Sequence, residues 1–335
     1  MHRIGRLVLS AALTLQAAPL VANDSTAERA AGGLVLRQSD AIDMLSEDLY
    51  VSTELIRVDY VFRNQSDVDV TTLVAFPMPD RDLEQDRYGD VAYPSGFETL
   101  VDGAPVDLEV EIRAFLGETE HTALLRELGV PLASEHGAWE IGRALDALPR
   151  DARDRLIEAG LAETTEYDAG EGLERHLEPL WTVRETWFWE QTFPAGEDVR
   201  IRHAYAPGAG GGFNAMLADA DFRESEFGRQ MIADYCIDAN VMAGIERLHR
   251  EAGEGDATPI ILDRAFTYIL TTGGNWRSPI GEFRLVVDKG APENIVSFCG
   301  EGVRRISPTE FEVRHTDWRP DRDLKVIVFS PIPGY

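Results

Sequence analysis

Residues 54–79 read ELIRVDYVFRNQSDVDVTTLVAFPMP and decide the fold that we expect. Apolar residues alternate with mostly polar ones along both halves of this stretch, and a period of two gives a β-strand one apolar face. Residues 64–67 between the halves have short polar side chains that favour a turn. The sequence therefore predicts an antiparallel hairpin whose apolar face needs a second layer to cover it. The apolar rows are Ile56, Val58, Tyr60 and Phe62, then Val68, Val70, Val74 and Phe76.

The same alternation recurs on both sides of this stretch, so residues 30–115 predict an antiparallel β-sandwich. From about residue 118 the apolar period becomes helical, and residues 117–165 predict a helical insertion of short helices. Strand-like alternation returns over residues 181–205, with a turn in the middle. We expect this second hairpin to complete the sandwich.

A glycine run, GAGGG at residues 208–212, predicts a flexible joint and a domain boundary. Beyond it, two helical segments precede five short strand-like segments. The predicted organisation is thus mainly β: an N-terminal β-sandwich with a helical insertion over residues 23–207, then a smaller α+β unit over residues 208–335. The second unit is β-rich and carries a short helical hairpin.

The first 22 residues have the pattern of a secretory signal peptide. A short basic region is followed by a largely apolar run from Leu7 to Leu20. Cleavage after Ala22 would make Asn23 the first residue of the mature chain. Leu20, three residues before that bond, is larger than the residue usually found there, so the sequence leaves the exact cleavage site open. The leader predicts a periplasmic or secreted protein, and no later stretch is apolar enough to cross a membrane.

The charge and the cysteines narrow the class of protein further. The formal net charge of −27 is spread along the chain, which disfavours nucleic acid and anionic lipid as partners. The chain has two cysteines, Cys236 and Cys299. An even pair in an exported protein predicts a disulfide. It would close a loop of about 60 residues and stabilise the C-terminal unit by about 4 kcal/mol.

No pattern in the sequence predicts a metal centre or a cofactor. The histidines beyond residue 22 lack the spacing of zinc ligands. A loop with alternating acids has oxygen ligands that suit calcium, but Gln85 and Val91 stand where an EF-hand needs glycine and glutamate. We expect a solvated acidic loop, with a weak calcium site as the alternative. Its acids are Asp80, Asp82, Glu84 and Asp86.

The aromatic run Trp187, Phe188 and Trp189 is the candidate binding surface. A stripe of aromatic rings suits a glycan or peptide groove, although tryptophan also packs well in cores. Phe188 has the opposite parity to the tryptophans, so it is expected to face outward or toward a second layer.

Catalytic motifs are absent from the sequence. It contains neither a G-x-S-x-G elbow nor a P-loop. Paired carboxylates stay open as a catalytic device, because 59 acids guarantee close pairs somewhere.

Several strings taken together resemble one bacterial exported family. They are NDSTAERAAGGLVL from residue 23, LIRVDYVFRNQSDVDVTTLVAFPMPD from residue 55, YCID around Cys236, TGGNWRSPIGEFRLVVDKG from residue 272, VSFCGEGV around Cys299 and FEVRH from residue 311. The chain resembles, over nearly its whole length beyond the leader, the family known as domain of unknown function 4424. The resemblance implies an extracytoplasmic bacterial protein and no activity.

These observations favour an exported, non-catalytic binding or structural module. Its partner would be a protein, peptide or glycan of the periplasm, with no cofactor. The alternative is an extracytoplasmic hydrolase that uses paired carboxylates between the two units.

Overall fold

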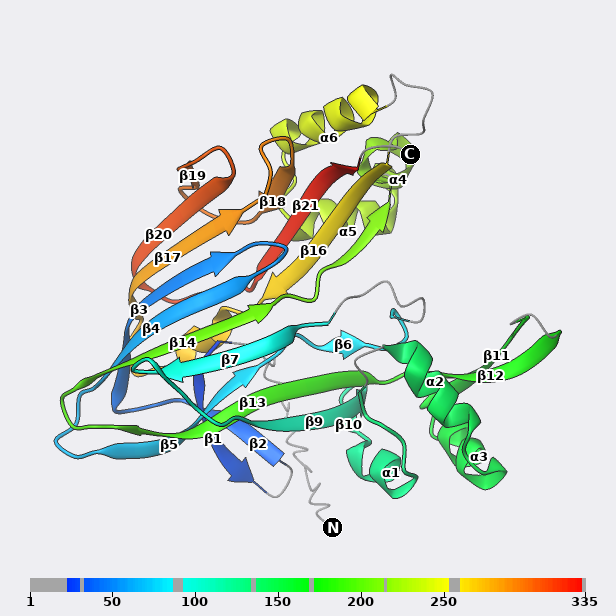
Figure 1. The fold of residues 1–335 in the computed structure, drawn as a ribbon, viewed down its shortest axis with the longest axis horizontal. Helices are drawn as coiled ribbons and strands as arrows, with labels where there is room; N and C mark the ends of the chain where they lie inside the picture. Colours follow the sequence, from blue (N-terminus) through cyan, green and yellow to red (C-terminus); the bar gives the residue numbers. More distant parts are fainter. Residues whose placement is uncertain are drawn as a thin grey trace, which may run out of the picture.

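The computed structural model describes residues 23–30, 33–86, 93–133, 137–168, 172–213, 216–252 and 260–332. The chain is mainly β, and its sheets are layered around one large core with helices at the margins (Figure 1). The fold class predicted from the sequence, a mostly antiparallel β protein with a helical insertion, is confirmed.

The central layer is an eight-stranded sheet. All its neighbouring strands are antiparallel except β3 and β17, which run parallel with Leu49 opposite Leu285. The strands, in spatial order, are β19 (Arg304–Arg305), β20 (Glu310–Trp318), β17 (Ile280–Asp288), β3 (Ile42–Val51), β4 (Ile56–Asn64), β14 (Asp198–Ala206), β7 (Ser95–Val101) and β8 (Ala104–Pro105).

Two further sheets cover the inner face of this layer and share one apolar core with it. The seven-stranded sheet has the order β10 (Thr119–Glu120), β9 (Glu109–Leu116), β13 (Thr182–Phe193), β5 (Val70–Pro77), β1 (Ser25–Ala30) and β2 (Gly33–Arg37), with β6 (Arg81–Asp82) also paired to β13. The four-stranded sheet has the order β15 (Gly210–Phe213), β16 (Ile260–Tyr268), β21 (Leu324–Ile332) and β18 (Ile295–Phe298).

The predicted central hairpin is wrong, because its two strands do not pair with each other, while the predicted apolar faces are right except at Val68. Strand β4 pairs with β3 and β14, whereas β5 pairs with β13 and β1, so the two strands lie in different sheets. Their apolar rows meet across the sandwich, and Val58 and Tyr60 are fully buried as expected. Sheets pack about 10 Å apart, and the segment between β4 and β5 is long enough to cross that distance. Val68 lies in this crossing segment and is 66% exposed.

One asparagine holds the two crossings between the layers together. The Asn64 side-chain amide donates hydrogen bonds to the carbonyls of Val68 and Phe193, both at 2.8 Å. Phe193 ends β13, and the chain then crosses to β14 in the other sheet. The second predicted hairpin is therefore also a crossing between sheets.

The helical insertion is confirmed between β10 and β11. It contains α1 (Thr122–Glu127), α2 (Ala138–Asp146) and α3 (Arg150–Glu158), followed by the two-stranded sheet of β11 (Ala162–Asp168) and β12 (Leu173–Pro179). Its apolar residues form a separate core against one end of the seven-stranded sheet, around the buried Trp181.

The glycine run is a strand rather than a flexible joint. Gly210 to Gly212 belong to β15, which pairs with β16. A Cβ atom on Gly211 would lie 1.9 Å from the carbonyl oxygen of Asp263, so this close approach requires glycine. The predicted boundary at residue 208 also does not separate sheets, because β17 and β20 of the C-terminal half join the sheet of β3 and β4.

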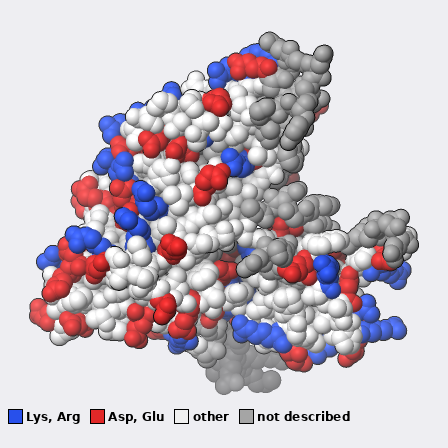
Figure 2. Space-filling model, viewed as in Figure 1, with Lys and Arg blue, Asp and Glu red and all other residues white. Residues whose placement is uncertain are grey.

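The C-terminal half adds helices to the outer side of the four-stranded sheet, where they bury a third, smaller core. These are η1 (Met216–Ala218), α4 (Ala220–Glu224), α5 (Glu226–Asp234) and α6 (Ala239–Ala252), while a short turn of 3-10 helix, η2 (Thr271–Asn275), follows β16. On the face seen in Figure 2, acidic and basic side chains are interspersed rather than gathered in one patch. No helix of the described residues is long and apolar enough to cross a membrane.

Candidate functional site

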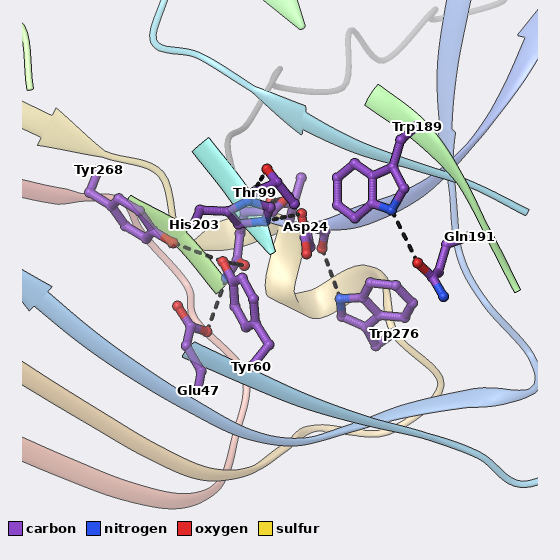
Figure 3. Close-up of polar contacts among 11 residues, drawn as sticks. Asp24, Glu47, Tyr60, Thr99, Trp189, Gln191, His203, Tyr268 and Trp276 are labelled. Atoms are coloured by element: carbon purple, nitrogen blue, oxygen red, sulfur yellow. Dashed lines mark hydrogen bonds and ion pairs between the residues drawn. The ribbon is translucent and has the colours of Figure 1, made fainter. Parts of the chain in front are cut away.

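A buried polar network lies where the three sheets meet, and it is built around the start of β1. Asn23 and Asp24 are both 0% exposed. Figure 3 shows side chains converging there from β3, β4, β7, β14, β16 and the segment after η2. Residues from both halves of the chain therefore contribute to one cluster.

The first part of the network links two tyrosines to a glutamate. The Tyr60 hydroxyl donates to Oδ1 of Asn23 at 2.5 Å and lies 2.9 Å from the Tyr268 hydroxyl (Figure 3). The side-chain amide of Asn23 then donates to Oε2 of Glu47 at 3.0 Å. Thr272 adds a hydrogen bond from its hydroxyl to the Asn23 carbonyl at 2.7 Å.

The second part of the network has the order of a catalytic relay. Nδ1 of His203 lies 2.7 Å from the Thr99 hydroxyl, and Nε2 lies 3.0 Å from Oδ1 of Asp24. The indole N–H of Trp276 donates to the Asp24 carbonyl at 2.8 Å. His203 is 0% exposed and Thr99 only 3% exposed, so a substrate has no access to this hydroxyl. We interpret the relay as structural.

Burial dominates the electrostatics of the network. It raises the pKa of Glu47 to about 8, an effect that the Asn23 hydrogen bond opposes and the charge of Asp24 increases. The pKa of Asp24 is also raised by burial, against the influence of His203. Oε1 of Glu47 and Oδ2 of Asp24 have no hydrogen-bond partner among the described residues.

A cleft of about 730 Å³ lies outside this network. Its walls come from β6 and the two residues before it on one side and from α4, α5, β15 and β16 on the other. Much of the lining is aromatic, including Phe222 and Phe227, whose rings pack edge to face at 5.9 Å between centroids. Phe227 is 69% exposed, so its ring is available to a ligand.

The charged side chains that line the cleft are mostly acidic, five aspartates and Arg81. Asp80 and Asp234 already bind cations of the chain, Arg184 at 3.0 Å and Lys325 at 2.7 Å. Asp263 makes no ion pair with a described residue, and its partial burial raises the pKa of its carboxyl. This carboxylate lies against Gly212, where a Cβ atom would be 3.2 Å from Oδ1.

The residues of the predicted aromatic binding surface lie outside the 730 Å³ cleft. Trp189 is buried in the main core, and Trp187 is half-buried with its ring stacked on Phe97 at 5.5 Å. Phe188 has the opposite orientation to the tryptophans, as expected, but it is only 4% exposed and packs against residues of β1, β2 and β5 in its own sheet. The guanidinium of Arg29 lies 5.0 Å from its ring centroid. None of Trp187, Phe188 and Trp189 lines the 730 Å³ cleft, and their role in binding stays a prediction.

The acids of the predicted weak calcium site are bound separately. Asp80 pairs with Arg184, and Asp86 accepts a hydrogen bond from the backbone N–H of Ala138 at 3.1 Å. Asp82 accepts from the backbone N–H groups that follow it, a turn in which Glu84 is exposed. Within the described residues, no three His, Cys, Asp or Glu side chains converge as metal ligands do.

The predicted disulfide between Cys236 and Cys299 is confirmed. It joins the segment between α5 and α6 to the residue that follows β18. The bond therefore ties the outer helices to the edge of the four-stranded sheet.

Sequence reasoning missed both the cleft and the buried network. Phe227 and Asp263 are separated by the whole of α6, and nothing in their sequence neighbourhoods links them. The sequence marks Asn23 only as the residue after the expected cleavage site and gives no signal for Asp24. The burial of these two polar residues depends on contacts with β3, β14 and η2.

Two solved structures are similar to the chain at low identity. One is a candidate nutrient binding protein from Legionella pneumophila subsp. pneumophila str. Philadelphia 1, with 14% identity and a TM-score of 0.44 over 92% of this chain and 70% of that one. The other is an M1 zinc metallopeptidase from Deinococcus radiodurans, with 8% identity and a TM-score of 0.23 over 87% of this chain and 43% of that one. Neither similarity is strong enough to carry a function to this chain.

No curated protein matches the sequence. A family model does match it, over residues 22–327, which is nearly the whole chain. The match includes every strand and helix that builds the network and the cleft, apart from the end of β21. The chain belongs to the family described as Domain of unknown function (DUF4424).

Proposed function

We propose that this protein is an exported, non-catalytic binding module whose ligand site is the 730 Å³ cleft between β6 and the α4–α5 helices. The observation that carries the proposal is the composition of this cleft: aromatic rings, of which Phe227 is exposed, together with acidic side chains. Ligand pockets are typically 300–1,000 Å³ in volume and mostly apolar, with a few polar groups that orient the ligand.

The chemistry of the cleft favours a cation with an aromatic or branched apolar body. Phe227 and Phe222 offer apolar surface, and aromatic faces also attract cations. Asp263 supplies a carboxylate that no cation of the described chain neutralises. An organic amine, or the basic end of a peptide, matches both features.

Export is supported by the disulfide, because such bonds persist mainly in oxidising compartments. The leader-like first 22 residues point the same way. The periplasmic location is part of the proposal, and so is the class of ligand, an organic amine or the basic end of a peptide.

The test is titration calorimetry with phenethylamine and, as its anionic counterpart, 3-phenylpropionate. Phenethylamine should bind and 3-phenylpropionate should not. Phe227→Ala should weaken amine binding by about 1–2 kcal/mol, since exposed aromatic anchors contribute that much to binding. Asp263→Asn should reduce the preference for the amine over the acid.

Val68→Ala is the matched control, because Val68 is 66% exposed, close to the 69% of Phe227, and does not line the cleft. This variant should bind like the wild type. Equal binding of the amine and the acid, or unchanged binding by Phe227→Ala, would remove the cleft as the ligand site.

The alternative function, a hydrolase that uses paired carboxylates, is favoured by one observation: five aspartates line the same cleft. Burial raises the pKa of one of them, Asp263, which is the direction that suits a general acid. Turnover of a glycoside or peptide substrate that Asp263→Asn abolishes would favour the hydrolase over the binding module.

A further inference from the structure

Hydrogen bonds fix Asn23 in the core through its side-chain amide nitrogen, its side-chain oxygen and its backbone carbonyl. Its side chain donates to Glu47 and accepts from Tyr60, and its carbonyl accepts from Thr272. The residue is 0% exposed. Three hydrogen bonds to three different elements place Asn23 as firmly as any core residue.

Two carboxylates beside Asn23 lack a full set of partners. Oε1 of Glu47 and Oδ2 of Asp24 accept no hydrogen bond from a described residue, although both side chains are completely buried. Among the described residues no lysine or arginine pairs with either acid, and His203 pairs with Asp24 alone. Buried carboxylates without partners are costly, and a cation with several N–H donors beside them would remove that cost.

Both ring nitrogens of His203 already have partners, Asp24 and Thr99, and the backbone nitrogen of Asn23 is a further group that can become such a cation. Four covalent bonds separate it from the side-chain amide nitrogen, so the two nitrogens lie within about 5 Å of each other. That amide is 3.0 Å from Glu47. An ammonium group at this nitrogen would carry a positive charge and three donors, whereas a peptide nitrogen carries one donor and no charge.

We propose that the Ala22–Asn23 bond is hydrolysed during maturation and that the new α-ammonium group of Asn23 is the buried counter-ion of Glu47 and Asp24. A leader-removing peptidase adds one water across the bond. Ala22 leaves with the carboxylate, and the freed amine of Asn23 takes up a proton, as α-amino groups with a pKa near 8 do at neutral pH. The inference rests on the proposed export and is independent of the cleft.

The position of the cut follows from the same contacts. A cut upstream of Ala22 would leave the nitrogen of Asn23 in a peptide bond, where it carries one donor and no charge. A cut downstream would remove Asn23 and its three hydrogen bonds. The family match also begins at residue 22, which places the start of the shared sequence at this point.

The first experiment is intact mass and N-terminal sequencing of the protein recovered from the periplasm. The mature chain should begin at Asn23. A chain that is exported but begins at another residue would overturn this inference while leaving the proposed export in place. A chain that keeps residues 1–22 would contradict both.

The second experiment tests the counter-ion. Two chains are released from the same carrier by a protease, one beginning at Asn23 and one with a single glycine before it. The extra residue moves the ammonium group by about 3.8 Å. The glycine should lower the folding equilibrium constant at least tenfold, measured by urea unfolding.

The same pair of chains in a Glu47→Gln background separates charge from crowding. If the ammonium group pairs with Glu47, the added glycine should lower the folding equilibrium constant much less in this background. An equal penalty in both backgrounds would mean that the glycine acts only by its size, and the inference would fail.

A third measurement does not depend on Glu47→Gln being stable. The α-amine should react with an amine-specific reagent more slowly than Lys325, whose side chain is 41% exposed, until denaturant is added. Faster labelling of the α-amine than of Lys325 in the folded protein would overturn the buried ion pair.

Discussion

The hydroxyl groups of Tyr60 and Tyr268 lie 2.9 Å apart in the core, although 208 residues separate them along the chain. Tyr60 belongs to β4 of the eight-stranded sheet, and Tyr268 ends β16 of the four-stranded sheet. This contact joins the two halves of the chain at the buried network, so its loss should lower the free energy of unfolding of the whole fold.

Tyr60→Phe should lower the free energy of unfolding by about 2 kcal/mol, because it leaves Oδ1 of Asn23 and the Tyr268 hydroxyl without their partner. Tyr268→Phe should cost about 1 kcal/mol, because Tyr60 keeps its bond to Asn23. Urea unfolding of both variants checks the order. A larger loss for Tyr268→Phe would contradict the assignment of Asn23 as the main partner.

Val58→Asp should destabilise the protein by about 4 kcal/mol, since it places an unpaired charge in the main core. Arg57→Asp, on the exposed face of the same strand, should cost under about 1 kcal/mol. Thermal unfolding of the two variants gives the comparison, and equal melting temperatures would show that the face assignment of β4 is wrong.

Phe188→Ala should destabilise the protein by about 3 kcal/mol, because Phe188 fills the small core between β13 and β1. An outward-facing Phe188 would instead leave folding intact. Phe227→Ala serves as the control, since Phe227 is exposed. Similar stabilities of the two variants would argue against the packing of β1 and β2 on Phe188.

Removing the disulfide with Cys236→Ser and Cys299→Ser together should cost about 4 kcal/mol, the value expected when a loop of this length is opened in the unfolded chain. The cysteines are 63 residues apart. The oxidised protein should show no free thiol when it is alkylated under denaturing, non-reducing conditions. Alkylation of both cysteines would disprove the bond.

Glu312 should make stability depend on acid pH. Hydrogen bonds from Arg314, Arg284 and Arg304 lower the pKa of this glutamate to about 2, from an ordinary value of 4.5. The folded state therefore binds the proton less readily than the unfolded state does. The stabilisation is complete above about pH 4.5 and is lost as the pH falls toward 2.

Glu312→Gln should flatten the fall in melting temperature between about pH 4.5 and 2, and lower the melting temperature at pH 7. Glu282→Gln, an exposed glutamate on the neighbouring strand β17, is the control. The same acid profile in wild type and Glu312→Gln would exclude the arginine cluster as its cause.

The sequence predicted the class of fold because the spacing of apolar residues is local information. The alternation around Val58 and Tyr60 identified a strand and its buried face, and both were confirmed. The change to a helical period located the insertion, and two cysteines could form one intramolecular pair. The strand and the helices depend on neighbours along the chain, whereas the disulfide could be predicted because the chain has only two cysteines.

Tertiary structure alone decided which strands pair and which polar residues meet. The same alternating pattern suits a hairpin or two strands facing each other across a sandwich, because both bury one face of each strand. Which of the two forms depends on the segment around Val68, which crosses from one sheet to the other, and on the hydrogen bonds of Asn64 that hold this crossing. Likewise, Asn23, Glu47 and Tyr268 carry no mark of burial in their own neighbourhoods, since hydrogen bonds between distant elements make that burial possible.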